Sequence, residues 1–115
     1  MAEKDPLYRR IRDGILFDCY GTSLTEKQRM ACEMILVQDL SLAEAAEALG
    51  VSRQGVHDLL SRAREHMENY ERDFGVAARR RQIAELTRTI EDNRERIPQD
   101  IYAELKKILE KGAEK

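Results

Sequence analysis

Hydrophobic residues recur three and four positions apart along almost the whole chain, which is the spacing that places them on one face of an α-helix. No segment shows the strict alternation of apolar and polar residues that is typical of a β-strand. The pattern changes phase mostly at glycine, at proline or at a residue that can cap a helix. The predicted helices span residues 7–19, 26–38, 42–49, 53–74, 76–97 and 101–109. The sequence therefore predicts an all-α fold.

Two rows of apolar residues lie on either side of the central part of the chain. The row that defines the apolar face of the first predicted helix is Leu7, Ile11, Ile15 and Cys19. The second row has nearly the spacing of heptad a and d positions and consists of Ile83, Leu86, Ile90 and Ile97. Asn93 takes the polar position of this heptad pattern. We expect the second row to form either a dimer interface or one arm of a helical hairpin.

Residues 41–65 have the length and the residue types of a helix-turn-helix motif. Ser41 and Glu44 have the spacing of a capping box at the start of a short helix. Gly50 can adopt the positive φ that the turn needs, and Ser52 can cap the second helix. Each element of the motif therefore has a residue suited to its conformation.

Four short segments of the chain resemble the YlxM family of small bacterial helix-turn-helix proteins, which is itself similar to region four of sigma factors. These segments are Thr25–Gln28, Asp39–Leu42, Val51–Gln54 and Val56–Asp58. The resemblance is close over residues 16–70 and thinner beyond Gly75. Ala45 and residues 34–37 depart from the family pattern, and these departures concern the core.

The resemblance implies a sigma-region-four-like helix-turn-helix core with a C-terminal helical arm. It also implies a cytoplasmic, non-enzymatic regulator or adaptor of the signal recognition particle pathway, which binds the GTPase or the RNA of the particle. From the helical pattern we place the helix-turn-helix domain at residues 1–75 and the arm at residues 76–115, packing on the core or on a dimer partner.

The second helix of the motif supplies the candidate partner-binding residues. They are Ser52, Arg53, Gln54, His57, Ser61, Arg62 and Arg64. Gln54 suits adenine and Arg53 suits guanine or phosphate, so a sequence-specific DNA-binding transcriptional regulator is the alternative function. Asp58 and Glu65 do not suit a nucleic acid, and residues 25–66 carry five basic against seven acidic residues, a net charge of -2. Because phosphate neutralisation supplies most non-specific affinity, this charge favours contact with a protein or a ribonucleoprotein.

The predicted arm contains a run of three basic residues, Arg79, Arg80 and Arg81. The run is either part of a solvated helix face or a binding site for RNA phosphate or an acidic protein surface. The apolar residues in segments 67–74 and 83–97 exceed what a small helical core needs. We therefore predict a homodimer through these segments.

Composition excludes several classes of protein. The 115 residues suffice for one domain, and 37% of them are charged, with 20 basic and 22 acidic side chains and a net charge of -2. No apolar run approaches the ~20 residues that span a bilayer, and the N-terminus has no secretory signal pattern. We therefore expect a cytoplasmic protein that does not enter a membrane.

The sequence offers little for catalysis or for metal binding. Cys19 and Cys32 are too few for a disulfide framework, and neither is paired with a histidine at zinc-ligand spacing. His57, Asp58 and Ser61 could form a triad on paper, but neighbouring side chains diverge on a helix. We therefore expect no cofactor, no metal and no enzymatic activity.

Overall fold

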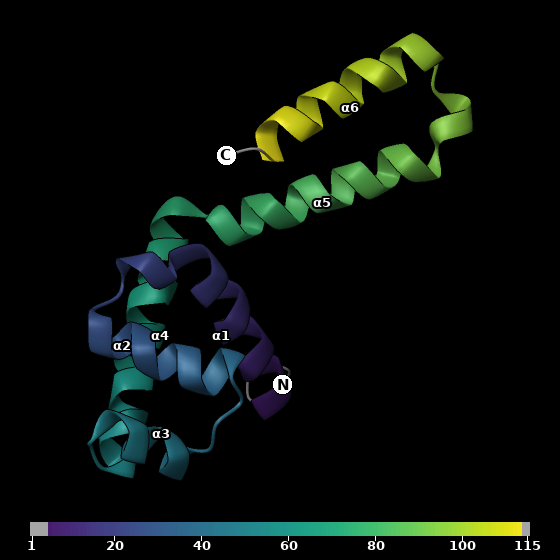
Figure 1. Ribbon diagram of the computed structural model, residues 1–115. Coiled ribbons are helices and arrows are strands. Elements are labelled where there is room, and N and C mark those ends of the chain that lie inside the picture. Colours follow the sequence, from purple (N-terminus) through teal and green to yellow (C-terminus); the bar gives the residue numbers. More distant parts are fainter. Residues whose placement is uncertain (1–4, 114–115) are drawn as a thin grey trace. The chain divides into compact units, whose positions relative to one another are not determined.

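The computed structural model describes residues 5–113, and this part of the chain contains helices joined by short turns, without a strand (Figure 1). The α-helices are α1 (Pro6–Tyr20), α2 (Glu26–Cys32), α3 (Leu42–Leu49), α4 (Arg53–Phe74), α5 (Val76–Asp92) and α6 (Gln99–Ala113). Three short helical segments lie between them: η2 (Gly21–Ser23), η3 (Glu33–Val37) and η4 (Arg94–Arg96). The prediction of an all-α fold is confirmed.

Side-chain caps fix the starts of α2, α3 and α4. The Ser41 hydroxyl accepts from the backbone N–H of Glu44 at 3.1 Å, and the Glu44 carboxylate accepts from the backbone N–H of Ser41 at 2.9 Å. Thr25 and Gln28 form the same reciprocal pair at α2, at 3.2 Å in both directions. The Ser52 hydroxyl accepts a backbone N–H of α4 at 2.9 Å. The predicted capping box at α3 and the predicted cap at α4 are confirmed.

The second predicted helix consists of α2 and the π-helical segment η3, and it ends where Asp39 adopts a φ of 60°. Arg10 of α1 holds this end of the helix. Its Nη2 atom donates to the Asp39 carboxylate at 2.6 Å and to the carbonyl oxygen of Ile35 at 2.7 Å. The charged hydrogen bonds stabilise a backbone conformation that side-chain-bearing residues seldom adopt.

The chain forms two compact units, the first ending at Ala77 and the second beginning at Ala78. The first unit has two clusters of buried residues. One cluster joins α1, α4 and the start of α5 and contains Leu16, Tyr20, Met67 and Ala77. The other joins α3 to α4 and contains Ala45, Ala46 and Val56. Small alanines in the second cluster allow the two helices of the motif to approach each other closely.

The face of α1 that contacts the core is not the side that carries Leu7, Ile11 and Ile15. Leu7, Ile11 and Ile15 are 66%, 55% and 50% exposed. The residues of α1 that are buried lie on the opposite side of the helix: Asp13, Leu16 and Tyr20. The spacing of the apolar row identified the helix correctly, but an exposed apolar row and a buried one have the same periodicity. The apolar row therefore identifies the helix but not its buried side.

In the second unit, α5 ends at Asp92 instead of continuing to residue 97 as predicted. The cause is Asn93, whose side-chain Nδ2 donates to the carbonyl oxygen of Thr89 at 2.7 Å. The backbone carbonyl of Asn93 accepts from the N–H of Arg96 at 2.9 Å, which starts the tight turn η4. Asparagine competes in this way with regular helical hydrogen bonds. Asn93 therefore ends a helix, and its predicted place in a continuous heptad pattern was wrong.

Candidate partner-binding face of the helix-turn-helix

The turn between α3 and α4 has the backbone conformation that the sequence predicted. Gly50 has a φ of 69°, in the left-handed region that glycine adopts without strain. The backbone N–H of Val51 donates to the carbonyl oxygen of Ala46 at 3.0 Å, so a hydrogen bond closes the end of α3. Val56 is fully buried against α3. These contacts hold the start of α4 in a fixed position relative to α3.

The first three turns of α4 present one polar face to solvent. Most of the predicted partner-binding residues lie there: Ser52, Arg53, Gln54, His57 and Arg62 are exposed, and Ser61 is partly exposed. Gln54 is not free, because its Nε2 atom donates to the Asp58 carboxylate at 3.0 Å. Arg53 and Arg62 form no ion pair with another residue in the described part of the chain. This face is therefore characterised by two exposed arginines without an ion-pair partner among the described residues, which lie beside the Asp58 carboxylate.

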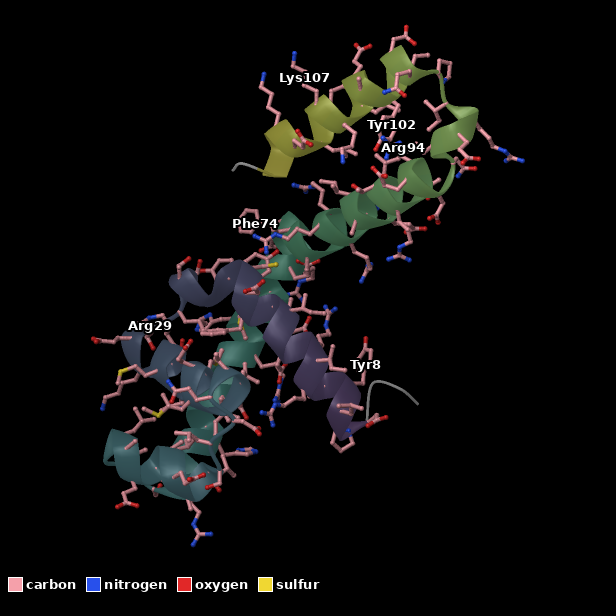
Figure 2. The ribbon with its side chains drawn as sticks, turned by 45° about the vertical axis from the view of Figure 1, so that its right-hand side comes forward. Tyr8, Arg29, Phe74, Arg94, Tyr102 and Lys107 are labelled. Atoms are coloured by element: carbon pink, nitrogen blue, oxygen red, sulfur yellow. The ribbon has the colours of Figure 1, made fainter. Side chains whose placement is uncertain are left out.

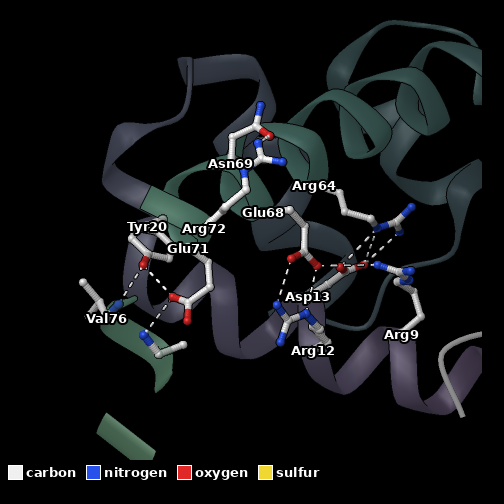
Figure 3. A network of polar contacts seen from close by, with 11 residues as sticks. Arg9, Arg12, Asp13, Tyr20, Arg64, Glu68, Asn69, Glu71, Arg72 and Val76 are labelled. Atoms are coloured by element: carbon white, nitrogen blue, oxygen red, sulfur yellow. Dashed lines mark hydrogen bonds and ion pairs between the residues drawn. The ribbon is translucent and has the colours of Figure 1, made fainter. Parts of the chain in front are cut away.

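Arg64, which we expected on the same face, is held against α1 (Figure 3). Its Nε atom donates to both carboxylate oxygens of Asp13 at 3.0 and 3.1 Å, and its Nη2 atom donates to one of them at 2.8 Å. The hydrogen bonds to Asp13 raise the pKa of Arg64 above its usual value. Because Asp13 is buried, Arg64 serves to neutralise a carboxylate inside the first unit.

A second charged contact joins α1 to α4 one turn further along (Figure 3). Arg12 donates from Nε and Nη2 to the two carboxylate oxygens of Glu68 at 2.9 and 2.8 Å, and Arg9 lies 3.7 Å from the same carboxylate. The hydrogen bonds from Arg12 lower the pKa of Glu68. Neither pair could be predicted from local sequence patterns, since the partners lie 51 and 56 residues apart. The only signal in the sequence was that α1 and α4, two helices that must pack in the core, both carry charged residues.

An open pocket of about 220 Å³ lies between α1, η3 and α4 and has a mainly apolar lining that includes Cys32, Leu60 and Met67. Burial raises the pKa of the Cys32 thiol to about 11, so the thiolate form that acts as a nucleophile is scarce near neutral pH. No group of three or more potential metal ligands occurs among residues 5–113. In the same part of the chain, no helix is long and apolar enough to cross a membrane.

The predicted basic run, Arg79 to Arg81, lies on α5 and is exposed. Successive residues of an α-helix point about 100° apart, because one turn contains 3.6 residues. The three guanidinium groups therefore spread around the helix and do not converge on one face. A single phosphate group could not contact all three of them at once.

A capped short helix, a left-handed glycine turn and a long second helix together define a helix-turn-helix protein. The model of the family UPF0122, described as "Putative helix-turn-helix protein, YlxM / p13 like", matches residues 7–108. The chain belongs to this family, as the resemblance in its sequence indicated.

Relatives from several bacteria share much of the chain. A UPF0122 protein of Thermoanaerobacter sp. (strain X514) is 40% identical over 103 residues, which cover 86% of each chain. A UPF0122 protein of Clostridium kluyveri is 40% identical over 96 residues, covering 84% of this chain and 86% of the relative. One from Staphylococcus haemolyticus is 46% identical over 68 residues, covering 59% of this chain and 62% of the relative.

Proposed function

We propose that this protein is a non-enzymatic adaptor that regulates the signal recognition particle pathway. In this proposal the helix-turn-helix contacts the GTPase of the particle or its RNA, and the contact is made by the exposed face of α4. Membership of the UPF0122 family supports the proposal through the function that the resemblance to YlxM proteins implies.

The charge on the exposed face of α4 is the observation that carries the proposal. Asp58 and Glu65 are exposed at its centre, and Asp58 accepts the hydrogen bond of Gln54. A helix that reads the major groove would have to bring these two carboxylates close to phosphates. Gln54, the side chain best suited to adenine, would also have to give up its hydrogen bond to Asp58. Both requirements weaken binding to duplex DNA.

An apolar stripe on the outside of α1 adds support for a protein partner. Leu7, Ile11 and Ile15 lie on the same side of the helix at intervals of four and are at least half exposed. Exposed apolar rows of this kind are typical of surfaces that pack against another protein. This stripe therefore favours the GTPase over the RNA as the component that is bound.

The alternative function is sequence-specific DNA binding by a transcriptional regulator. The observed geometry of α3, the turn and α4 favours it, because a helix-turn-helix places its second helix in the major groove. Arg53 and Arg62 are exposed on that helix and have no ion-pair partner among the described residues. These arginines are able to contact phosphates on either side of a groove.

Titration calorimetry of the full chain against three separate ligands tests the two functions. The ligands are the GTPase subunit of the particle, its RNA, and a mixed-sequence DNA duplex. We expect a dissociation constant below about 10 μM for the GTPase or the RNA and weaker binding to the duplex. Duplex binding without a complex with either component of the particle would overturn the proposal.

The variant Asp58→Asn separates the functions further, since it removes one negative charge and weakens the hold on Gln54. If α4 reads DNA, duplex affinity should rise by about fivefold. If α4 contacts the GTPase, affinity for the GTPase should fall or stay unchanged. Asp100→Asn, an exposed carboxylate at the start of α6, makes the same charge change away from the motif and is the matched control.

A further inference from the structure

We infer that the second unit, formed by α5, η4 and α6, is completed by the same unit of a second copy of this chain, as a four-helix bundle. The inference does not depend on the proposed function. Among the described residues from Ala78 onward, only Ile90 and Tyr102 are buried. Chains shorter than about 40 residues seldom hold a stable core without help, and this unit contains 38 residues, Ala78 to Lys115.

Polar contacts join the two helices near their connection. The Tyr102 hydroxyl donates to the Glu91 carboxylate at 2.7 Å, and Lys106 lies 3.5 Å from the same carboxylate. Arg94 lies 4.6 Å from the centre of the Tyr102 ring, and Figure 2 shows these two side chains together at that end of the unit. These contacts hold the hairpin at its turn and leave the rest of both helices to be covered.

The uncovered parts of both helices carry apolar side chains. Ile83 and Leu86 of α5 are 46% and 52% exposed, and Ile101 and Ile108 of α6 are 47% and 62% exposed. Each pair is separated by three or seven residues, so each lies on one side of its helix. The hairpin therefore exposes apolar surface on both of its helices.

Beside Leu86, one face of α5 is almost free of charge in a chain in which 37% of residues are charged. This face carries Gln82, Leu86 and Thr89, and Asn93 follows directly after the helix ends. The one charged member of the face, Arg79, lies near the start of the helix. The Thr89 hydroxyl donates to the carbonyl oxygen of Glu85 at 2.9 Å, and the Asn93 amide donates to that of Thr89 at 2.7 Å. Because these polar groups already have partners within the helix, covering them leaves few hydrogen bonds unmade.

An uncharged, exposed helix face suits another helix of the same kind and does not suit a nucleic acid or a charged protein surface. Leu86 lies near the middle of α5, so two copies of α5 that cross antiparallel at Leu86 place this residue next to its own counterpart. Ile83 of one copy then falls near Thr89 of the other. The positive segment 79–81 falls near the end of the partner helix, where Glu91 and Asp92 lie. Antiparallel packing also aligns the helix dipoles favourably.

The available area reaches the minimum that a specific dimer needs. With 17 residues, α5 is about 25 Å long, and two helices side by side are about 20 Å wide. The resulting face of about 500 Å² per copy, or about 1,000 Å² in total, reaches the lower limit of specific interfaces. The second unit thus has both the surface and the chemistry to pair with itself.

Sedimentation velocity of the full chain at about 10 μM tests the inference. We expect a species with twice the chain mass of 13.3 kDa. Leu86→Lys and Leu86→Glu should each weaken dimerisation by about 100-fold or more, because each places like charges at the two-fold axis. An equimolar mixture of the two variants should recover at least about tenfold in affinity as a heterodimer, since the charges are then opposite.

Control variants distinguish this dimer from a dimer that forms through another surface of the chain. Ile11→Lys with Ile15→Lys changes the exposed stripe of α1 and should leave dimerisation unchanged. Circular dichroism checks that every variant remains helical. A monomeric wild-type chain, or a mixture of the two Leu86 variants that stays monomeric, overturns the inference. A dimer lost only on changing α1 overturns it in favour of an interface through the first unit.

Discussion

The hydroxyl of Tyr20 donates a 2.6 Å hydrogen bond to the Glu71 carboxylate and accepts a 3.0 Å hydrogen bond from the backbone N–H of Val76 (Figure 3). The same carboxylate oxygen of Glu71 accepts the backbone N–H of Ala77 at 2.9 Å. The first N–H groups of a helix have no partner within that helix. Tyr20 of α1 and Glu71 of α4 therefore cap α5 from outside, directly after Gly75, which ends α4 with a φ of 62°.

Tyr20→Phe should destabilise the protein by about 1–3 kcal/mol. The substitution keeps the ring and its stacking on Tyr70 but leaves Glu71 and Val76 without their buried partner. Urea unfolding followed by circular dichroism measures the change in the free energy of unfolding. Tyr8→Phe, at an exposed position of α1, is the control and should lie within about 0.5 kcal/mol of the wild type. Equal stability of the two variants would show that the cap contributes nothing.

The contribution of Tyr20 should disappear at high pH. Burial, and then the hydrogen bond to Glu71, raise the pKa of Tyr20 above its ordinary value of 10.0. The folded state therefore keeps a proton that the unfolded chain loses near pH 10, so the stabilisation is complete below that pH and is lost as the pH rises through the folded pKa. The difference in unfolding free energy between wild type and Tyr20→Phe should shrink between pH 9 and pH 11.5. A constant difference across this range would contradict the assignment.

Arg64→Ala should reduce stability by about 3 kcal/mol, the lower end of the range for breaking a buried ion pair, because the Arg64 side chain is 36% exposed. The loss arises from Asp13, which is buried and would have no charged partner. Arg64→Lys should recover only part of the loss, since an ammonium group cannot make the paired hydrogen bonds of a guanidinium. Thermal unfolding measures both variants, with Arg62→Ala as a control that should unfold at nearly the wild-type temperature.

The pair of Arg12 and Glu68 predicts a loss of stability in acid. Hydrogen bonds from Arg12 lower the pKa of Glu68 below its ordinary value of 4.5. The folded state therefore binds this proton less readily than the unfolded chain, so the stabilisation is present above pH 4.5 and is lost as the pH falls through the folded pKa. In urea unfolding between pH 5 and pH 3, Glu68→Gln should show a shallower decline than the wild type. Parallel declines would place the acid sensitivity in other carboxylates.

Local features of the sequence predicted the elements of the first unit well. A capping box requires two residues at a fixed spacing, and Ser41 with Glu44 could be recognised without knowledge of the rest of the fold. The same holds for Gly50, because the left-handed conformation of a turn depends on that residue alone. The helix-turn-helix could be predicted for this reason: its hydrogen bonds connect residues that are close in the sequence.

Contacts between distant segments could not be predicted in the same way. Asp13 is a polar residue on the buried side of α1, and it is buried only because Arg64, 51 residues later, neutralises it. The sequence pattern of Leu7, Ile11 and Ile15 identifies the helix but not its buried side. Without knowledge of Asp13 as a partner, Arg64 was grouped with the exposed residues of α4. A single pairing between α1 and α4 therefore accounts for that error.

The two arginines that remain available on α4 should govern partner binding. Arg53→Ala with Arg62→Ala should weaken binding to the GTPase or the RNA of the particle by about 10-fold or more, while the free energy of unfolding changes by less than about 0.5 kcal/mol. Arg64→Ala should show the opposite pattern, with reduced stability and near-normal binding by the folded fraction.

Titration at several salt concentrations identifies the partner. For RNA, the slope of log affinity against log salt should fall by about 1 for each arginine removed, because each phosphate contact releases a counterion. For a protein partner, the slope should be small in the wild type and change little. Binding that is unchanged in the double variant would exclude this face of α4 as the contact surface.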